Sequence, residues 1–196
     1  MYGEDRNIRL FVGLGLVILL MFVVIFLIIN HGSDGGDKGK VAETKKELTS
    51  YVNDSDVTVT QSIVGPIRAI QNHNQMEINV TNSSVTANRI NGYDGNVVGS
   101  LNYPMTNASF SEFLNALNRA GFTSGITDEK LQDDQGFCPT GNRYIYTVRE
   151  GSKIVQRFWA TSCGGTKTYE GNLSLTINLF HAQVPDYSNL MSGSGI

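Results

Sequence analysis

Cysteine and histidine are scarce in this chain, which has two cysteines and three histidines among 196 residues. So few thiol and imidazole groups leave little material for a structural zinc site, and no paired-histidine metalloprotease motif or phosphate-binding glycine loop occurs. Positive charge is not in excess, because 15 basic residues face 18 acidic ones and the formal net charge is −3. A general nucleic-acid binder carries a concentrated positive face. The sequence therefore predicts no metal, no cofactor and no nucleic-acid partner.

Long apolar runs are limited to one, Leu10 to Ile29, where twenty consecutive positions lack a polar side chain. A helix of that length spans about 30 Å, the thickness of a bilayer's hydrocarbon core. Seventeen of the twenty are Leu, Ile, Val or Phe, so membrane insertion is favoured by roughly 5–10 kcal/mol. A cleaved signal peptide has a shorter apolar region and a small-residue cleavage site, which this chain lacks. We expect an uncleaved transmembrane helix over residues 10–30, after a tail at residues 1–9.

Charges on both sides of this run give a mixed signal on its orientation. Arg6 and Arg9 precede it and four lysines follow, so a raw count points the C-terminal domain inward. However, Arg9 abuts the run, whereas the first residues after it include Asp34 and Asp37 and no lysine. Long domains also translocate largely regardless of charge. Together with the cysteine pair, this favours a cytoplasmic N-terminus and an extracytoplasmic C-terminal domain at the cell membrane.

Residues 31–53 have the composition of a flexible linker. His31 to Lys40 contains four glycines and no apolar side chain, so it cannot bury surface. Val41 to Val52 is compatible with a short charged helix, although its apolar stripe is thin. Type IV pilins also join an apolar helix to a disulfide-bearing α/β head. This chain lacks their processing site and glutamate, and its glycines would break the helix, so a pilus-like subunit is kept as an alternative.

The pattern after the linker indicates short strands. Apolar and polar residues alternate in Val57 to Thr60 and in Met76 to Val80. The turn signals Asn91-Gly92 and Asp94-Gly95 then precede an apolar stretch at Val97 to Leu101. Three or four antiparallel strands therefore fit this part of the chain.

One helix is well specified between residues 109 and 121. Ser109 and Glu112 have the spacing of a capping box at its start, and Gly121 supplies a left-handed residue at its end. Phe122 is placed to pack back on the last turn. Helical spacing puts four apolar residues on one face, which we expect to face the core: Phe110, Phe113, Leu114 and Leu117.

The two cysteines flank a strand-like pair of segments, Arg143 to Arg149 and Lys153 to Thr161. A two-residue turn at Glu150-Gly151 pairs positions whose numbers sum to 301, and Cys138 then falls opposite Cys163. Directly opposed residues on antiparallel strands are close enough for a disulfide with modest adjustment. A disulfide is thus predicted, which points to an oxidising compartment. Buried free thiols and a catalytic thiol remain the alternatives.

The same register sorts the side chains of this hairpin, because they alternate with period two. Five apolar residues, the polar Lys153 and Arg157 and both cysteines then share the face that we expect to be the core, with Trp159 near the disulfide. The opposite face would carry Ile145, Ile154 and Phe158. On the first face, the apolar members are Tyr144, Tyr146, Val148, Val155 and Trp159.

Residues 172–184 fit either a strand or a helix. Helix is favoured, because Asn172 is a suitable cap, Gly171 precedes it and Pro185 is a stop. The tail at residues 191–196 is expected to be disordered. The fold class is therefore α+β: an N-terminal transmembrane helix, then a small antiparallel-sheet ectodomain over residues 54–190 with one or two packed helices and a disulfide-linked hairpin.

Residues with chemical potential are few. Asp128, Glu129, Asp133 and Asp134 crowd one loop but lack the spacing of a calcium-binding loop, so a solvated acidic surface is favoured over a weak cation site. A further candidate is a ligand-facing aromatic platform. It would use Tyr103 and Tyr169, with Tyr144 and Trp159 nearby, although a packing role is favoured for all four.

Three segments of the last sixty residues resemble uncharacterised single-pass membrane-anchored ectodomain proteins of Saccharibacteria-type bacteria. They are the stretches 138–144 (CPTGNRY), 159–163 (WATSC) and 179–187 (LFHAQVPDY). The resemblance implies a bacterial cell-surface protein and transfers no catalytic or ligand residues. We expect a non-enzymatic domain that binds a protein or cell-envelope ligand. An envelope hydrolase or transferase, or a subunit of a pilus-like or other membrane assembly, is the alternative.

Overall fold

The computed structural model describes residues 47–196. The predicted tail, the transmembrane helix and the first part of the linker lie outside these residues. Within residues 47–196, no helix is long and apolar enough to cross a membrane.

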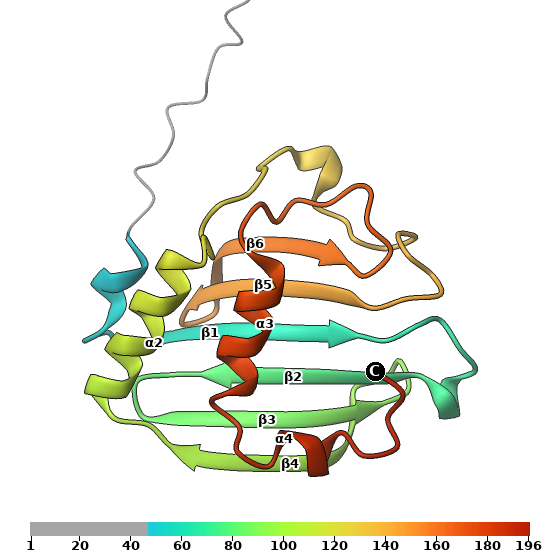
Figure 1. The fold of residues 1–196 in the computed structure, drawn as a ribbon, viewed down its shortest axis with the longest axis horizontal. Helices are drawn as coiled ribbons and strands as arrows, with labels where there is room; N and C mark the ends of the chain where they lie inside the picture. The colour runs from blue at the N-terminus through green and yellow to red at the C-terminus, as the bar shows by residue number, and fades with distance from the viewer. Residues whose placement is uncertain (1–46) are drawn as a thin grey trace, which may run out of the picture. The chain divides into compact units, whose positions relative to one another are not determined.

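A single antiparallel sheet of six strands forms the scaffold (Figure 1). Its spatial order is β4-β3-β2-β1-β5-β6, so the chain builds one half with consecutive hairpins and then returns to the other side of β1. The expected strands between residues 56 and 103 are confirmed as four. The strands are β1 (Val57–Val64), β2 (Asn74–Val80), β3 (Ser84–Asn91), β4 (Asn96–Pro104), β5 (Arg143–Glu150) and β6 (Lys153–Thr161).

Helices cover one face of this sheet, where α2 (Asn107–Arg119) and α3 (Leu173–His181) lie across the strands (Figure 1). The short α4 (Tyr187–Leu190) follows beside β4. Phe180 of α3 packs edge-on against Phe113 of α2, with ring centroids 5.2 Å apart. The α+β class is thus confirmed for residues 47–196.

The packed unit begins earlier than residue 54. Leu48 and Tyr51, in the one-turn helix η1 (Leu48–Tyr51), are 1% and 5% exposed and belong to the same core as α2. The end of the expected linker is therefore anchored, because two apolar side chains there have a surface to bury.

Helix α2 has the predicted core face, since all four of its expected apolar residues are buried. Its start was predicted wrongly. The helix begins at Asn107, and the hydroxyl of Thr106 accepts the hydrogen bond from the Ser109 amide at 3.1 Å. Ser109 thus lies inside the first turn and cannot be the cap. The end is as predicted, with Gly121 at φ 76° and the Phe122 amide bonded to the Leu117 carbonyl at 3.0 Å.

The β5–β6 hairpin differs from the predicted register. The turn lies at Gly151-Ser152, one residue later than expected, with Glu150 opposite Lys153. A bulge then shifts the register, so that Tyr146 pairs with Phe158 instead of Val155. The physical reason is Gly151, whose φ of 56° suits the first central position of a tight hairpin turn.

This shift exchanges the faces of β6, because one residue of slip turns every side chain over. Phe158 now faces the helices with Tyr146, whereas Trp159 points to the opposite side with its partner Ile145. Trp159 is nevertheless fully buried, because the segment between α2 and β5 covers it there. Its indole N–H donates to the Leu131 carbonyl at 2.7 Å, and its ring packs against Phe137.

The C-terminal region is ordered to its end. Helix α3 confirms the helical interpretation of residues 172–184, and the Asn172 side chain accepts from the Leu175 amide at 3.0 Å. Residues 191–196, expected to be disordered, instead return to the sheet (Figure 1). Ser194 is buried, and its carbonyl accepts from the Asn74 side chain at 2.8 Å. The tail is held because the ends of β2 and β3 supply polar partners for its backbone.

Candidate functional site: an arginine-lined pocket

An open cavity of about 470 Å³ lies where the C-terminal segment crosses the ends of the central strands. We call it the arginine pocket. Its wall consists of Arg68 and residues 71–72, Asn74 of β2, Arg89 and Asn91 of β3, Val98 of β4, and residues 192–195. Its volume is in the range of small-molecule sites, which are about 300–1,000 Å³.

Paired asparagines on β2 and β3 shape the floor of the pocket. Asn74 and Asn91 are direct partners in the β2–β3 register. The Asn91 amide donates to the Asn74 side-chain oxygen at 3.3 Å, and also to the Gln71 and His73 carbonyls at 3.1 and 3.2 Å. These bonds fix the loop that contains η2 (Ile70–Asn72) to the sheet.

His73 supports the same loop from inside. It is 1% exposed, and its ring stacks on Tyr93 with centroids 4.0 Å apart. Its Nδ1 lies 3.0 Å from the Pro66 carbonyl oxygen. The Tyr93 hydroxyl in turn donates to the Arg68 carbonyl at 2.9 Å. Residue Arg68 is thus positioned through its backbone, which leaves its guanidinium in the pocket wall.

Arg89 joins the sheet to the C-terminal segment. Its Nη1 donates to the Ser192 carbonyl at 3.0 Å and to the Leu190 carbonyl at 3.3 Å. Its Nε is buried and has no hydrogen-bond partner among the described residues. Unpaired buried donors are costly, and they are uncommon in folded proteins. Arg89 therefore has one donor whose demand the protein itself does not meet.

Two glycines let the C-terminal segment close over the pocket. Gly193 and Gly195 have φ values of 77° and 68°, in the left-handed region that other residues adopt only at a cost. The Arg68 guanidinium lies next to Gly195, 3.4 Å from where a Cβ would stand. The alternation Ser192-Gly-Ser-Gly, interpreted from the sequence as a loose tail, is the local signal for this wall.

Positive charge dominates the pocket. Arg68 and Arg89 are the charged residues in its wall, and neither forms an ion pair with a carboxylate in residues 47–196. The rest of the wall is amide, hydroxyl and backbone groups, apart from Val98. This arrangement can bind an anion and orient it with hydrogen bonds.

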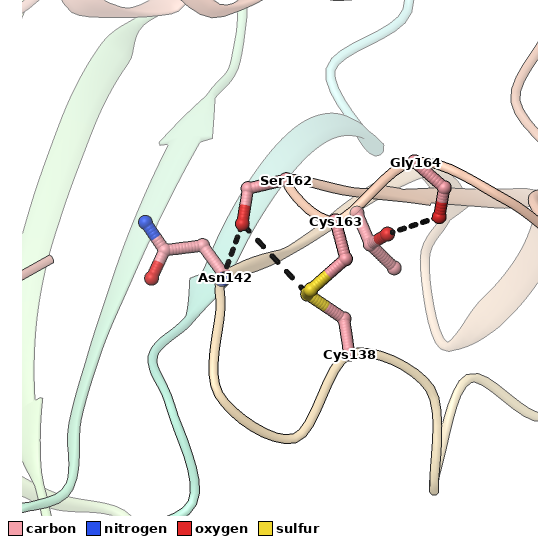
Figure 2. Close-up of a disulfide and its surroundings, with 6 residues drawn as sticks. Cys138, Asn142, Ser162, Cys163 and Gly164 are labelled. Carbon is pink, nitrogen blue, oxygen red and sulfur yellow. Dashed lines mark hydrogen bonds between the residues drawn. A yellow bond between two sulfur atoms is a disulfide. The ribbon is translucent and has the colours of Figure 1, made fainter.

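The predicted disulfide is present at the end of the β5–β6 hairpin (Figure 2). Cys138 and Cys163 are bonded, with Cα atoms 5.6 Å apart. The pairing is confirmed although the register that led to it is wrong, because Cys138 reaches Cys163 from a loop before β5. With both sulfurs in the bond, neither free thiols nor a thiol nucleophile remains.

The disulfide loop is closely packed around Ser162 and Gly141. The Ser162 hydroxyl accepts from the Asn142 amide at 2.9 Å and lies 3.8 Å from the Cys138 sulfur (Figure 2). A Cβ on Gly141 would meet the Ser162 hydroxyl and both sulfurs. Glycine is therefore required here by close approach.

The aromatic platform considered from the sequence is divided among different environments. Tyr169 is 1% exposed, and its hydroxyl lies 2.6 Å from the Thr176 hydroxyl, so burial raises the pKa of this phenol. Tyr103 donates to the Asp186 carboxylate at 2.9 Å. Trp159 lies on the other side of the sheet from Tyr144 and Tyr103. These four side chains do not form one surface.

The acidic loop has structural roles. Asp134 is buried and pairs with Arg143 at 3.0 Å and with Arg157. Asp128 and Asp133 accept backbone N–H groups two residues ahead, at 2.9 Å each. Residues 47–196 contain no group of three His, Cys, Asp or Glu side chains suited to a metal ion.

Comparison with known proteins leaves the function to be argued from this geometry. No protein-family model matches the chain, and a search of curated proteins finds no significant match.

Proposed function

We propose that this chain is a single-pass membrane-anchored protein whose extracytoplasmic domain binds a ligand through the arginine pocket. The observation that carries the proposal is the pocket itself: an open, preformed cavity with two guanidinium groups that form no ion pair with a carboxylate in residues 47–196. Among the residues of its wall there is no histidine, cysteine or carboxylate. General acid–base catalysis usually relies on such groups, so the wall favours binding over turnover.

The location half of the proposal rests on two features. The apolar run at residues 10–29 has the length and composition of a membrane span. The Cys138–Cys163 disulfide is of a kind that persists in oxidising compartments and is rare in the cytosol. Together they support an anchor in the membrane and a folded domain outside the cytoplasm.

Protease treatment of intact cells tests the location. We expect added protease to degrade the C-terminal domain, while a cytosolic marker protein stays intact. The anchor is tested on the same cells, because the full chain should stay in the membrane fraction after alkaline carbonate extraction. A domain that is fully protected, or a full chain in the soluble fraction, contradicts this part of the proposal.

Turnover assays test binding against the enzymatic alternative. The full chain in neutral detergent is incubated with cell-wall fragments and peptide substrates, and products are followed by mass spectrometry. We expect the substrates to be unchanged. A product that forms with the wild type, and not with the heat-denatured protein, would show that the domain is a hydrolase or transferase.

A further inference from the structure

The charge of the arginine pocket limits what it can hold. Two guanidinium groups, from Arg68 and Arg89, face a cavity with no carboxylate in its wall. Planar guanidinium groups match the oxygens of phosphate and carboxylate in bidentate geometry. A phosphate monoester carries about −1.5 to −2 charges at pH 7, which two arginines would balance, whereas a carboxylate carries one.

The other donors of the wall point to the same kind of ligand. Arg89 Nε is buried without a partner among the described residues, while Nη1 of the same side chain is committed to two backbone carbonyls. The Gln71 and Asn72 side chains in the wall also make no hydrogen bond with another described residue. The Arg68 and Arg89 guanidinium groups and these two amides line the cavity, so a ligand oxyanion with several acceptor oxygens would meet them together.

An apolar rim borders this polar pocket. Among residues 47–196, five of the eight exposed large apolar side chains lie in the loop that contains η2, in the turn between β3 and β4, and at the start of β4: Ile67, Ile70, Tyr93, Val97 and Val98. Val98 is itself part of the wall, Ile70 lies against Gly92, and Tyr93 bonds to the Arg68 backbone. Val98 therefore brings apolar surface into the wall itself, and Ile70 and Tyr93 extend it over the neighbouring loop and turn.

We propose that the arginine pocket binds a phosphate monoester whose substituent is apolar, with the phosphate between Arg68 and Arg89 and the substituent on the rim. This inference rests on the proposed binding function and specifies its ligand class. The phosphate group can belong to a soluble ester or to the headgroup of a membrane lipid, and the experiment separates these two sources.

Isothermal titration calorimetry of the full chain tests the proposal directly. The protein is placed in nanodiscs of neutral phosphatidylcholine and titrated with n-butyl phosphate, inorganic phosphate and butyrate. We expect butyl phosphate to bind most tightly, at least about threefold better than inorganic phosphate because of the rim. Butyrate binding as tightly as butyl phosphate would overturn the phosphate assignment.

Charge variants locate the binding. Arg68→Gln should weaken butyl phosphate about tenfold, because it removes one charge-assisted contact. Gln71→Glu, which adds a carboxylate to the wall, should weaken it by a similar factor. The matched controls are Arg149→Gln and Gln135→Glu, exposed positions away from the pocket, which should bind like the wild type.

Arg89→Gln should abolish detectable binding, but it also removes the bonds that hold the C-terminal segment. For this reason the decision rests on Arg68→Gln and Gln71→Glu, whose side chains make no hydrogen bond within the described residues. If both bind butyl phosphate like the wild type, the site is elsewhere and the proposal is wrong. Absence of binding by every probe at millimolar concentration also overturns it, whereas the topology assays of the proposed function would be unaffected.

The rim is tested by Ile70→Ser, which should reduce the preference for butyl phosphate over inorganic phosphate toward unity. Ile154→Ser, a similarly exposed isoleucine on β6, serves as its control. A final arm replaces part of the nanodisc lipid with phosphatidic acid. Loss of butyl phosphate binding there would assign the natural phosphate to a lipid headgroup, and unchanged binding would assign it to a soluble ester.

Discussion

Asp134 shows how one buried side chain organises a segment without regular structure. Its carboxylate pairs with Arg143 of β5 and Arg157 of β6, and it is 8% exposed. Both arginines lie on the sheet face opposite to the helices, so the acid holds the segment before β5 against that face. From the sequence, Asp134 was one of four acids on a solvated surface, because nothing local distinguishes it from Asp133.

Asp134→Asn should destabilise the domain by about 3 kcal/mol, since it leaves two partly buried guanidinium groups without a counter-charge. Chemical denaturation measures the loss. Trp159 provides a second readout, because its indole bonds to the segment that Asp134 holds. Its emission should shift to the red as that segment loosens.

The control for this variant is Glu170→Gln. It removes the exposed ion pair between Glu170 and Lys167, whose charged atoms lie 3.9 Å apart. We expect a change of no more than about 0.5 kcal/mol there. Equal stability of both variants would show that the buried cluster contributes no more than a surface pair.

His181 makes stability depend on pH. Its ring stacks on Tyr187 with centroids 3.8 Å apart, its Nε2 is buried without a partner among the described residues, and burial lowers its pKa below 6.5. The unfolded chain therefore binds the proton more readily than the folded one. The stability contribution is complete above about pH 6.5 and is lost as the pH falls from there toward the folded-state pKa.

Denaturation midpoints measured between pH 7.5 and pH 5 test whether stability falls as the pH is lowered. This range brackets the ordinary histidine pKa of about 6.5. The wild type should lose stability over that interval more steeply than His181→Gln, which cannot gain the charge. Parallel curves for the two proteins would remove His181 as the cause.

At the level of elements, α2 is the helix that local sequence specified best. Its apolar spacing, its glycine end and the return of Phe122 all depend on neighbours within one or two turns. The cap was misplaced because Thr106 and Ser109 are both suitable capping residues, and only the packing of the turn after β4 decides between them.

Leu114→Ala should cost about 2–5 kcal/mol, because Leu114 is fully buried and the core cannot collapse around the lost side chain. Asn118→Ala on the exposed face of the same helix should change stability by no more than about 0.5 kcal/mol. Thermal or urea unfolding monitored by circular dichroism compares them. A small effect of Leu114→Ala would mean that α2 packs more loosely than the structure shows.

At the level of the whole molecule, the disulfide links the start of the β5–β6 hairpin to its end. It closes a loop of 25 residues, which in the chain-entropy estimate stabilises the fold by about 3.5 kcal/mol. Cys138→Ser should lose that amount under oxidising conditions, as measured by denaturant unfolding.

Reduction provides the matched comparison, because the reduced wild type should unfold at the same denaturant concentration as the Cys138→Ser variant. Non-reducing gels should also show a mobility difference between oxidised and reduced wild type that the variant lacks. Identical migration of the two wild-type samples would argue that the bond does not form in the isolated protein.

The sequence by itself determined features whose cause is local. Period-two alternation indicated β1 and β2, helical spacing placed the buried face of α2, Asn172 marked the start of α3, and two cysteines left only one intramolecular pairing. The transmembrane run is of the same kind, since its length and composition alone predict it, and it stays a prediction.

The tertiary structure decided the rest. A glycine turn and a bulge set the β5–β6 register, and with it the side of the sheet on which Trp159 lies. The arginine pocket needed Asn74, Arg89 and Ser194 brought together from positions up to 120 residues apart. No pattern within a short window can encode such a meeting, because it exists only once the sheet is assembled and the C-terminal segment has crossed it.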